Sequence, residues 1–486
     1  MSDNYEVVIG LEVHVELKTA SKLFCGCANL FGQDPNTHTC PVCLGMPGAL
    51  PVLNRDAVAL ATRAALALSC TVHSFSKFDR KQYFYPDLPK AYQISQYDQP
   101  LATHGQVTIR TEAGPRAIGI ERIHLEEDAG KLNHIGQRLG DATGSLVDLN
   151  RAGVPLIEIV SQPEMHSPEE ARLYLTELRT VLSYLDISDL RMEEGSMRCD
   201  ANVSLRPLSY TGSLADLPRV EIKNVNSFRN VQRGIEHEII RQRELLEQGI
   251  RIVKETRGFD DAAGTTYSQR SKEAANDYRY FPEPDLPPLV LDAVWLEDQK
   301  NQMPSLPEEL RHQLAAEGVL PRDVDVLVQD RALYGFWRQT VAIYPDVKLV
   351  TNWLLSDYSR HMNAKGLSFD NPGVSAPHLA ELLALIEDGT LSGKMAKEVL
   401  ESMFATGESP QVVVKRLGLS QITDHEAIRL IVSQIVEANP AVVADFLGGK
   451  EKALAFLVGQ VMKATKGQAK PDLVNALLRE VIASHV

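Results

Sequence analysis

The sequence predicts an α+β protein in which a region of mixed strands and helices precedes a region of helices alone. Short runs of alternating apolar and polar residues recur from residue 5 to about residue 290, and alternation with a period of two is typical of strands. Prolines then cluster between Pro282 and Pro307, where they disfavour both helix interiors and central strands. Beyond this break the strand pattern almost disappears.

The first region contains both strand and helix patterns. The strand patterns include Gly10–Leu17, Ile118–Ile123, Leu156–Val160, Arg198–Arg206 and Val220–Lys223. The helical patterns are Arg55–Ser69, Pro168–Leu185 and Asn230–Gln248. In the last of these, Val231, Ile235 and Ile239 fit one apolar stripe, as expected for a helix that packs on one side.

The proline cluster places the first domain boundary near residues 290–295. We predict a domain with a mixed or antiparallel sheet over residues 1–293, a helical domain over 294–405 and a small all-helical tail over 406–486. The breaks Asn439-Pro440 and Gly448-Gly449 divide the tail into short helices. A chain of 486 residues is long enough for about two to four domains.

The composition restricts the possible partners. The net charge is −14, so the field of the whole molecule repels nucleic acid, and any RNA contact needs a local basic patch. No apolar run is long enough to span a bilayer, and the first residues lack a basic segment followed by an apolar run. We therefore expect a cytoplasmic protein with no membrane partner.

Four of the six cysteines lie close together in a stretch rich in Gly, Pro and Asn: Cys25, Cys27, Cys40 and Cys43. In a reducing cytosol such a cluster favours a metal over disulfides, and two close pairs can form a tetrahedral thiolate site for Zn²⁺. Because sulfur would fill all four positions, we expect a structural zinc site. The alternative is four reduced thiols without a metal.

The predicted strand Gly10–Leu17 has one apolar face, and Glu12, His14 and Glu16 form the other face. Carboxylates with one imidazole are suitable ligands for Mg²⁺ or Mn²⁺. The alternative is an amphipathic strand whose polar face is solvated.

Further carboxylates stand on or beside other predicted strands. Glu126, Glu127 and Asp128 are adjacent and repel one another unless a cation or basic groups neutralise them, although an exposed acidic turn is the alternative. Glu158 lies inside a five-residue apolar run, so it should be partly buried and need a partner such as a metal. The remaining polar positions of this kind are Glu194, Asp200, Glu221 and Lys223. Such a set suits Mg²⁺ with a phosphate-bearing substrate.

Basic and aromatic residues are mixed between residues 77 and 92. Arg80 and Lys81 could hold phosphates, while Tyr83 or Tyr85 could stack on a base or ribose, which makes them candidate ATP- and substrate-binding residues. The alternative is an aromatic core with flanking surface charge.

The tail carries a local excess of positive charge. Its candidate RNA-binding residues are Lys450, Lys452, Lys463, Lys466 and Lys470. An apolar helical stripe runs between them, so a small basic helical module is one interpretation, and a solvated helix face is the other.

Several long motifs resemble the B-subunit family of the aspartyl/glutamyl-tRNA amidotransferases, the GatB/GatE family. They are Val8–Lys18, Cys40–Gly48, Lys77–Gln99, Leu125–Lys131, Asp148–Glu158, Met192–Arg206, Lys223–Phe228, Asp277–Asp285 and Phe456–Lys463. These motifs extend over nearly the whole chain. The resemblance implies a cradle-like catalytic domain, a helical domain and a small YqeY-like tail that binds tRNA.

The resemblance also implies a reaction. It is that of a carbon–nitrogen ligase, with glutamine as nitrogen donor, that amidates Glu on tRNA(Gln) or Asp on tRNA(Asn). ATP and Mg²⁺ would convert the side-chain carboxylate to an acyl phosphate, which ammonia then attacks. The implied partners are an amidase (the A subunit) that supplies ammonia through a channel, a small C subunit, the misacylated tRNA and the synthetase that misacylates it.

Site residues follow from the matching positions. The resemblance implies that the catalytic metal is bound by Glu12, His14, Glu127 and Glu158. The resemblance also places five residues in the surrounding kinase and transamidation site: Glu126, Glu194, Asp200, Glu221 and Lys223. A non-catalytic, zinc-stabilised RNA adaptor, whose acids only bridge to partner subunits, is the alternative from another functional class. Whether Glu-tRNA(Gln), Asp-tRNA(Asn) or both are substrates is left open.

Overall fold

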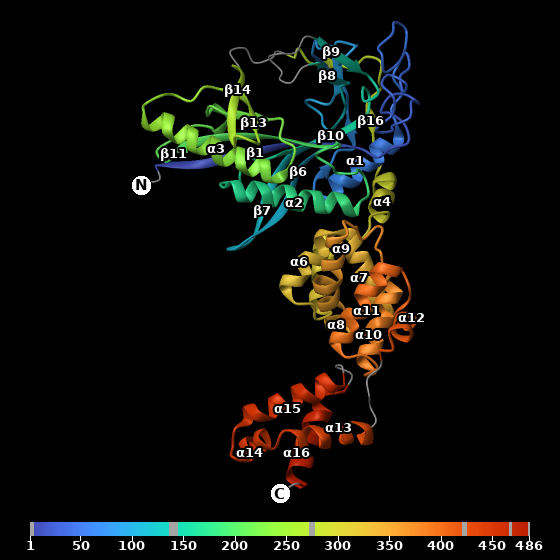
Figure 1. The fold of residues 1–486 in the computed structure, drawn as a ribbon. Helices are drawn as coiled ribbons and strands as arrows, with labels where there is room; N and C mark the ends of the chain where they lie inside the picture. Colours follow the sequence, from blue (N-terminus) through green and yellow to red (C-terminus); the bar gives the residue numbers. More distant parts are fainter. Residues whose placement is uncertain (1–3, 136–143, 272–277, 420–424, 466–468, 485–486) are drawn as a thin grey trace. The chain divides into compact units, whose positions relative to one another are not determined.

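The computed structural model describes residues 4–135, 144–271, 278–419, 425–465 and 469–484 of the chain (Figure 1). The chain divides into two compact units, Met1–Glu309 and Leu310–Val486. The first unit mixes strands and helices, and the second is built from helices. This arrangement confirms the predicted α+β class.

A nine-stranded sheet forms the body of the first unit, in the order β14-β13-β12-β11-β1-β10-β7-β6-β2. Its strands are β1 (Tyr5–Glu16), β2 (Thr71–Val72), β6 (Ala102–Thr111), β7 (Gly114–Glu127), β10 (Pro155–Ser161), β11 (Met197–Pro207), β12 (Val220–Lys223), β13 (Glu255–Asp260) and β14 (Thr265–Ser271). The central strand β1 pairs antiparallel with β10 and β11. β12 and β13 pair in parallel, so the sheet is mixed.

Three helices pack against the apolar face of this sheet: α1 (Arg55–Ala67), α2 (Pro168–Tyr184) and α3 (Phe228–Glu247). Each helix begins at a polar side chain that accepts a hydrogen bond from a backbone N–H of the first turn; these side chains are Asn54, Ser167 and Ser227. Figure 1 shows α2 and α3 side by side along the sheet.

The central strand β1 has the burial pattern that its sequence predicts. Ile9, Leu11, Val13 and Val15 are at most 1% exposed and belong to the main hydrophobic core. Since successive side chains of a strand alternate, this burial directs the intervening polar residues to the opposite face of the sheet.

The predicted elements of the first region are confirmed. The three predicted helices correspond to α1, α2 and α3, with ends that differ by at most two residues. The strands β1 and β7 are longer than predicted. In β1 the alternation is lost at Val7–Ile9, where Val8 is also buried, so the pattern alone did not reveal the strand's beginning.

Smaller sheets complete the first unit. The strands β15 (Phe281–Pro282), β4 (Asp79–Gln82) and β5 (Tyr92–Ser95) form one of them. Two further sheets have two strands each. One pairs β16 (Leu289–Val290) with β3 (Phe75–Ser76), and the other pairs β8 (Lys131–Ile135) with β9 (Gly144–Asp148). Helix α4 (Ala293–Asn301) packs against α1.

The rest of the described chain is helical, as predicted. The helices between Pro307 and Leu417 are α5 (Pro307–Ala316), α6 (Pro321–Gln329), α7 (Arg331–Ile343), α8 (Val347–Trp353), α9 (Ser359–Ala364), α10 (Ala376–Glu387), α11 (Gly393–Thr406) and α12 (Pro410–Leu417), with a π-helical turn at Leu354–Tyr358. α12 packs against α10 and α11.

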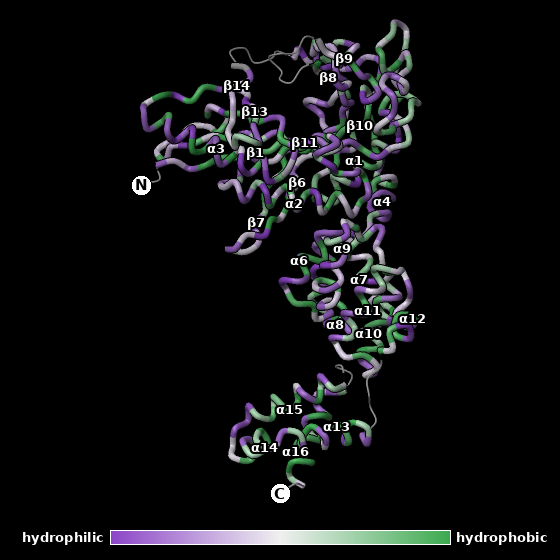
Figure 2. The backbone as a smooth tube through the Cα atoms, in the orientation of Figure 1, coloured by the Kyte–Doolittle hydropathy of each residue, from purple (hydrophilic) through white to green (hydrophobic). Residues whose placement is uncertain are grey.

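The helices of the predicted tail that follow α12 are α13 (His425–Ala438), α14 (Pro440–Leu447), α15 (Glu451–Ala464) and α16 (Pro471–Ser484). They share a hydrophobic core of their own, and Figure 2 shows the apolar stretches of α15 and α16. The division into domains at 293 and 405 remains a prediction. Within the described residues, no single helix has the length and apolar composition of a membrane span, although α13 and α14, bent by 92°, meet these criteria as a pair.

Candidate metal and catalytic site

The polar face of the nine-stranded sheet gathers charged side chains from five neighbouring strands, β7, β10, β1, β11 and β12. Strand pairing places His14 opposite Glu158, Glu158 opposite His124, and Glu12 opposite Asp200. Directly opposed residues point to the same face of a sheet, so these side chains lie on one surface. The register of the strands therefore assembles the candidate site.

The closest group on this face consists of His14, Glu126 and Glu158, which we call the metal group. One possible donor atom from each lies within 4.8 Å of the others. His14 Nε2 is 3.2 Å from a Glu158 oxygen and 3.9 Å from a Glu126 oxygen. His124 Nε2 lies 3.4 Å from Glu126 and 3.7 Å from Glu158. The Ser95 hydroxyl donates to Glu126 at 2.9 Å and orients that carboxylate.

Positive charge surrounds the two buried carboxylates. Burial acts to raise the pKa of Glu158, but His124 and His14 hold that pKa well below its usual value. Burial acts to lower the pKa of His14, yet the hydrogen bond and the charge of Glu158 raise it overall. Burial also acts to lower the pKa of Lys81, but the charges of Glu126 and Glu158 raise that pKa overall. The group therefore presents anionic oxygens beside an imidazole and a lysine.

This donor set fits a hard divalent cation. Carboxylate oxygens with an imidazole nitrogen suit Mg²⁺ or Mn²⁺. The three donor atoms of the metal group are close enough to share one ion. His124 adds a second imidazole, whose buried Nδ1 has no hydrogen-bond partner in the described structure.

Metal binding at this group should depend on pH. Because the pKa of His14 is raised, a metal ion must displace a proton from its imidazole, and acid competes with the metal. Affinity should fall by up to about tenfold for each pH unit below that pKa and recover above it. Titration of Mn²⁺ followed by electron paramagnetic resonance should show tighter binding at about pH 8 than at about pH 6. Equal affinity at both would contradict a role for His14 as a ligand.

Glu12 lies between the metal group and a second polar cluster. Asn202 Nδ2 donates to Glu12 at 3.0 Å, and burial and neighbouring carboxylates raise the pKa of Glu12. Lys223 Nζ is 2.6 Å from Asp200 and 3.2 Å from Glu221. These residues share the polar face with the metal group. Glu12, however, is not among the three residues whose donor atoms converge within 4.8 Å.

Glu127 points away from the metal group. Adjacent residues of a strand point to opposite faces, so Glu126 and Glu127 do not both face His14. Glu127 instead forms an ion pair with Lys90 and accepts a hydrogen bond from the Ile94 N–H at 3.0 Å. The structure therefore brings Glu126, and not the Glu127 that the resemblance implies, together with His14 and Glu158.

Glu194 is separate from both clusters. It pairs with Arg191 at 2.7 Å and lines, with Glu16 and Arg151, a cavity of about 380 Å³. Burial and the neighbouring Asp128 raise the pKa of Glu16 to about 8. The third polar residue of β1 thus faces this cavity, apart from the metal group.

The four candidates of the basic aromatic stretch have different surroundings. Lys81 is the one on which the charge of the metal group acts. Arg80 makes two hydrogen bonds of 2.8 Å to the buried carboxylate of Glu283, which ties β4 to the segment around β15. The rings of Tyr83 and Tyr85 stack on each other with centroids 5.6 Å apart. The charge of the metal group thus acts on Lys81, whereas Arg80 is paired with Glu283.

Two residues of the metal group's surroundings were not anticipated. His124 stands two residues before Glu126, so continued alternation along the predicted strand would have placed both on one face. Ser95 comes from β5 in another sheet, and no pattern in the sequence points to it.

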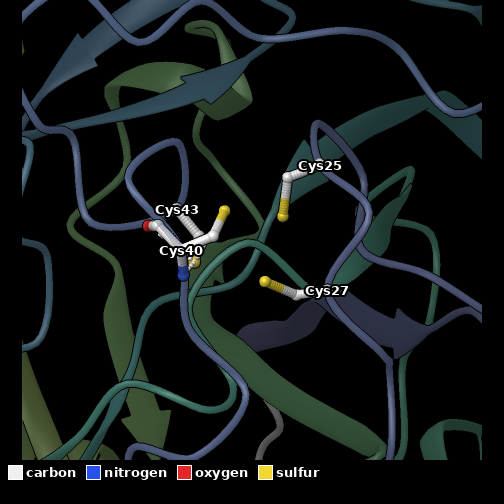
Figure 3. Close-up of side chains that lie close together, drawn as sticks. All are labelled: Cys25, Cys27, Cys40 and Cys43. Carbon is white, nitrogen blue, oxygen red and sulfur yellow. Dashed lines mark hydrogen bonds between the residues drawn. The ribbon is translucent and has the colours of Figure 1, made fainter.

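The four clustered cysteines face one another (Figure 3). Their sulfur atoms all lie within 4.8 Å of one another, and those of Cys40 and Cys43 are 3.9 Å apart. Tetrahedral zinc with Zn–S bonds of about 2.3 Å requires sulfur separations of roughly 3.8 Å. A hydrogen bond from the Cys25 thiol is the main cause that lowers the pKa of Cys43 to about 4. The donor set and its spacing fit Zn²⁺.

The candidate tRNA-binding lysines are exposed where the structure describes them: Lys450, Lys452, Lys463 and Lys470, whereas Lys466 lies outside the described residues. Lys452 and Lys463 are about three helical turns apart on α15 and share one face of it. The opposite face is buried in the tail core. Lys450 pairs with Asp445 at 2.8 Å, so its charge is partly neutralised.

Carboxylates, imidazoles and lysines that meet on one face of a sheet are typical of a metal-dependent enzyme of phosphoryl transfer. The family model of the GatB/GatE catalytic domain matches residues 7–297, and that of the GatB domain matches residues 336–482. The chain belongs to the GatB/GatE family.

Similar proteins match over almost their whole length. The chain is 54% identical over 478 residues to the B subunit of the aspartyl/glutamyl-tRNA(Asn/Gln) amidotransferase of Moorella thermoacetica, and the match covers 98% of this chain and 99% of the relative. It is 52% identical over 480 residues to the protein of that name from Carboxydothermus hydrogenoformans, and 50% identical over 482 residues to that from Brevibacillus brevis. Each of these two matches covers 99% of both chains.

Proposed function

We propose that this chain is the B subunit of a glutamine-dependent tRNA amidotransferase, a carbon–nitrogen ligase that amidates Glu or Asp on a misacylated tRNA. Its relatives of that name support the assignment by 50–54% identity over nearly full length. The convergence of His14, Glu126 and Glu158 supports the catalytic part in particular. In the adaptor alternative these acids would bridge to partner subunits, whereas Glu126 and Glu158 are only 2% and 7% exposed.

The polar face suits activation of a carboxylate by ATP. A carboxylate is a poor electrophile, so phosphoryl transfer from ATP would first convert the substrate side chain to an acyl phosphate. A bound Mg²⁺ supplies charge neutralisation for the phosphates. His14, Glu126 and Glu158 would hold that ion, and Lys81 would bind a phosphate oxygen. Lys223, fixed by two carboxylates, would orient the reacting groups while ammonia attacks and phosphate leaves.

The partners follow from the same proposal. An amidase, the A subunit, would hydrolyse glutamine and deliver ammonia through an internal channel, and a small C subunit would complete a cytoplasmic heterotrimer. The exposed lysines of the tail would bind the tRNA, which a synthetase supplies in misacylated form. In a chain of net charge −14, such a local group of lysines is where the tRNA would dock.

The substrate can be tested directly with the reconstituted heterotrimer. Glu-tRNA(Gln) and Asp-tRNA(Asn) are supplied separately with ATP, Mg²⁺ and glutamine, and the amino acids released from the tRNA are analysed. The proposal predicts ATP-dependent Gln, Asn or both. Failure to amidate either tRNA, with glutamine hydrolysis intact, would contradict it.

We also propose that the four cysteines bind a structural zinc ion. Elemental analysis of the purified complex should then give about one zinc per copy of this chain. Cys40→Ser should remove most of the zinc, because a tetrahedral site loses a quarter of its ligands. Cys70→Ser changes a cysteine outside the cluster and should leave the zinc content unchanged. A native complex that is folded and free of zinc would contradict the proposed zinc site.

A further inference from the structure

A completely buried lysine contacts the cysteine cluster. Lys22 is 0% exposed, although a lysine is seldom buried without a partner. Its ammonium has three protons and three acceptors within reach: the His38 carbonyl at 2.8 Å, the Leu149 carbonyl at 3.3 Å and the sulfur of Cys43 at 3.8 Å. The ammonium is therefore fully coordinated by two carbonyls and one cysteine sulfur.

The charge of Lys22 needs a counter-charge. Burying an ammonium is costly unless an opposite charge is close. Among the ion pairs of the described residues, none joins Lys22 to a carboxylate, so its only hydrogen-bond partner there that can be anionic is Cys43. Zn²⁺ with four thiolates has a net charge of about −2. A neighbouring ammonium would offset about half of that charge.

The contacts of Cys43 agree with this role. Its sulfur accepts the Cys40 backbone N–H at 3.1 Å in addition to the Lys22 ammonium. N–H donors to a metal-bound sulfur stabilise its negative charge and fix the orientation of the ligand. Lys22 also joins the cluster to the rest of the domain, because its third contact is to Leu149 and the next residue, Leu23, donates its N–H to Gly153 at 2.8 Å.

We propose that Lys22 is a positioning residue of the zinc site, whose buried ammonium neutralises the thiolate charge and retains the metal. This inference rests on the zinc site proposed above. It predicts a measurable property of this chain that is separate from catalysis, namely the rate at which zinc is lost.

The test is zinc release from the purified heterotrimer to an excess of the chelator 4-(2-pyridylazo)resorcinol, followed by absorbance. Loss of an outer partner of a metal ligand typically lowers metal affinity on the order of 10- to 100-fold, so Lys22→Met should release zinc faster than the native complex by a factor of that order. Lys18→Met is the matched control, since Lys18 is 55% exposed near the end of β1, and it should leave the rate unchanged. A native rate in Lys22→Met would overturn the inference.

A second measurement needs no variant, so it decides the matter even if Lys22→Met does not fold. The native complex is treated with an amine-acetylating reagent before and after zinc removal, and each lysine is assayed by mass spectrometry. Lys22 should be protected while zinc is bound and become reactive once it is removed, whereas Lys18 should react equally in both. Equal protection of Lys22 in both states would overturn the inference. If the native complex holds no zinc at all, the zinc site itself fails.

Discussion

Replacing Glu158 with Gln is expected to abolish ATP-dependent amide formation while tRNA binding is retained. The change keeps the shape of the side chain but removes the charge that pairs with His14 and His124. A metal ion held by the group would lose an anionic ligand. The rate of amide formation should fall on the order of 10²- to 10³-fold, as when a group that stabilises developing charge is removed.

The measurement is a single-turnover assay of the reconstituted heterotrimer with saturating misacylated tRNA. Glu121→Gln is the matched control, because Glu121 lies on β7 but is 51% exposed, and its rate should be native. Glutamine hydrolysis and tRNA affinity should also be native in Glu158→Gln. If amide formation survives in this variant, Glu158 does not bind the catalytic metal, and the adaptor interpretation becomes the better one.

Removing residues 420–486 is expected to weaken tRNA binding on the order of tenfold or more and to spare glutamine hydrolysis. The cut follows Leu419 because α12 packs against α10 and α11 and must be kept. The deleted helices α13 to α16 share a core of their own, so their removal takes no side chain out of the core of the catalytic unit. Because lysine contacts to phosphates release counterions, the salt dependence of tRNA affinity should also become shallower.

Charge reversal tests the same surface without a deletion. The double variant Lys452→Glu and Lys463→Glu alters one exposed face of α15 and should weaken binding in the same direction. A double variant of Lys394→Glu and Lys415→Glu has the same change in net charge on α11 and α12, outside the deleted residues 420–486, and serves as the control. Equal tRNA affinity in all forms, including the truncated one, would show that the tail is not part of the tRNA-binding surface.

Local patterns in the sequence were enough to predict most elements of the fold. The alternation around Glu12 and His14 predicted β1, and α1, α2 and α3 have the predicted ends within two residues. The cysteine cluster was predictable for the same reason, since its members are close in sequence. Lengths of strands were less predictable where both faces are buried, as at Val8.

The composition of the metal group could not be predicted from local sequence patterns. Its members come from three strands, and only the pairing register decides which acids meet His14. Glu126 and Glu127 are equally acidic in the sequence, but the pleat of β7 directs Glu126 to the metal group and Glu127 to Lys90. Contributions from other sheets, such as that of Lys81 on β4, depend on tertiary packing that no local pattern encodes.

The most direct test of the metal group is the ligand set of the bound ion. Mn²⁺ is added to the heterotrimer, and pulsed electron paramagnetic resonance is used to detect nitrogen coupled to the metal. We predict a nitrogen coupling from His14 that is lost in His14→Gln and kept in His104→Gln, a change at an exposed histidine. A native spectrum without nitrogen coupling, or one that His14→Gln leaves unchanged, would contradict the proposed site.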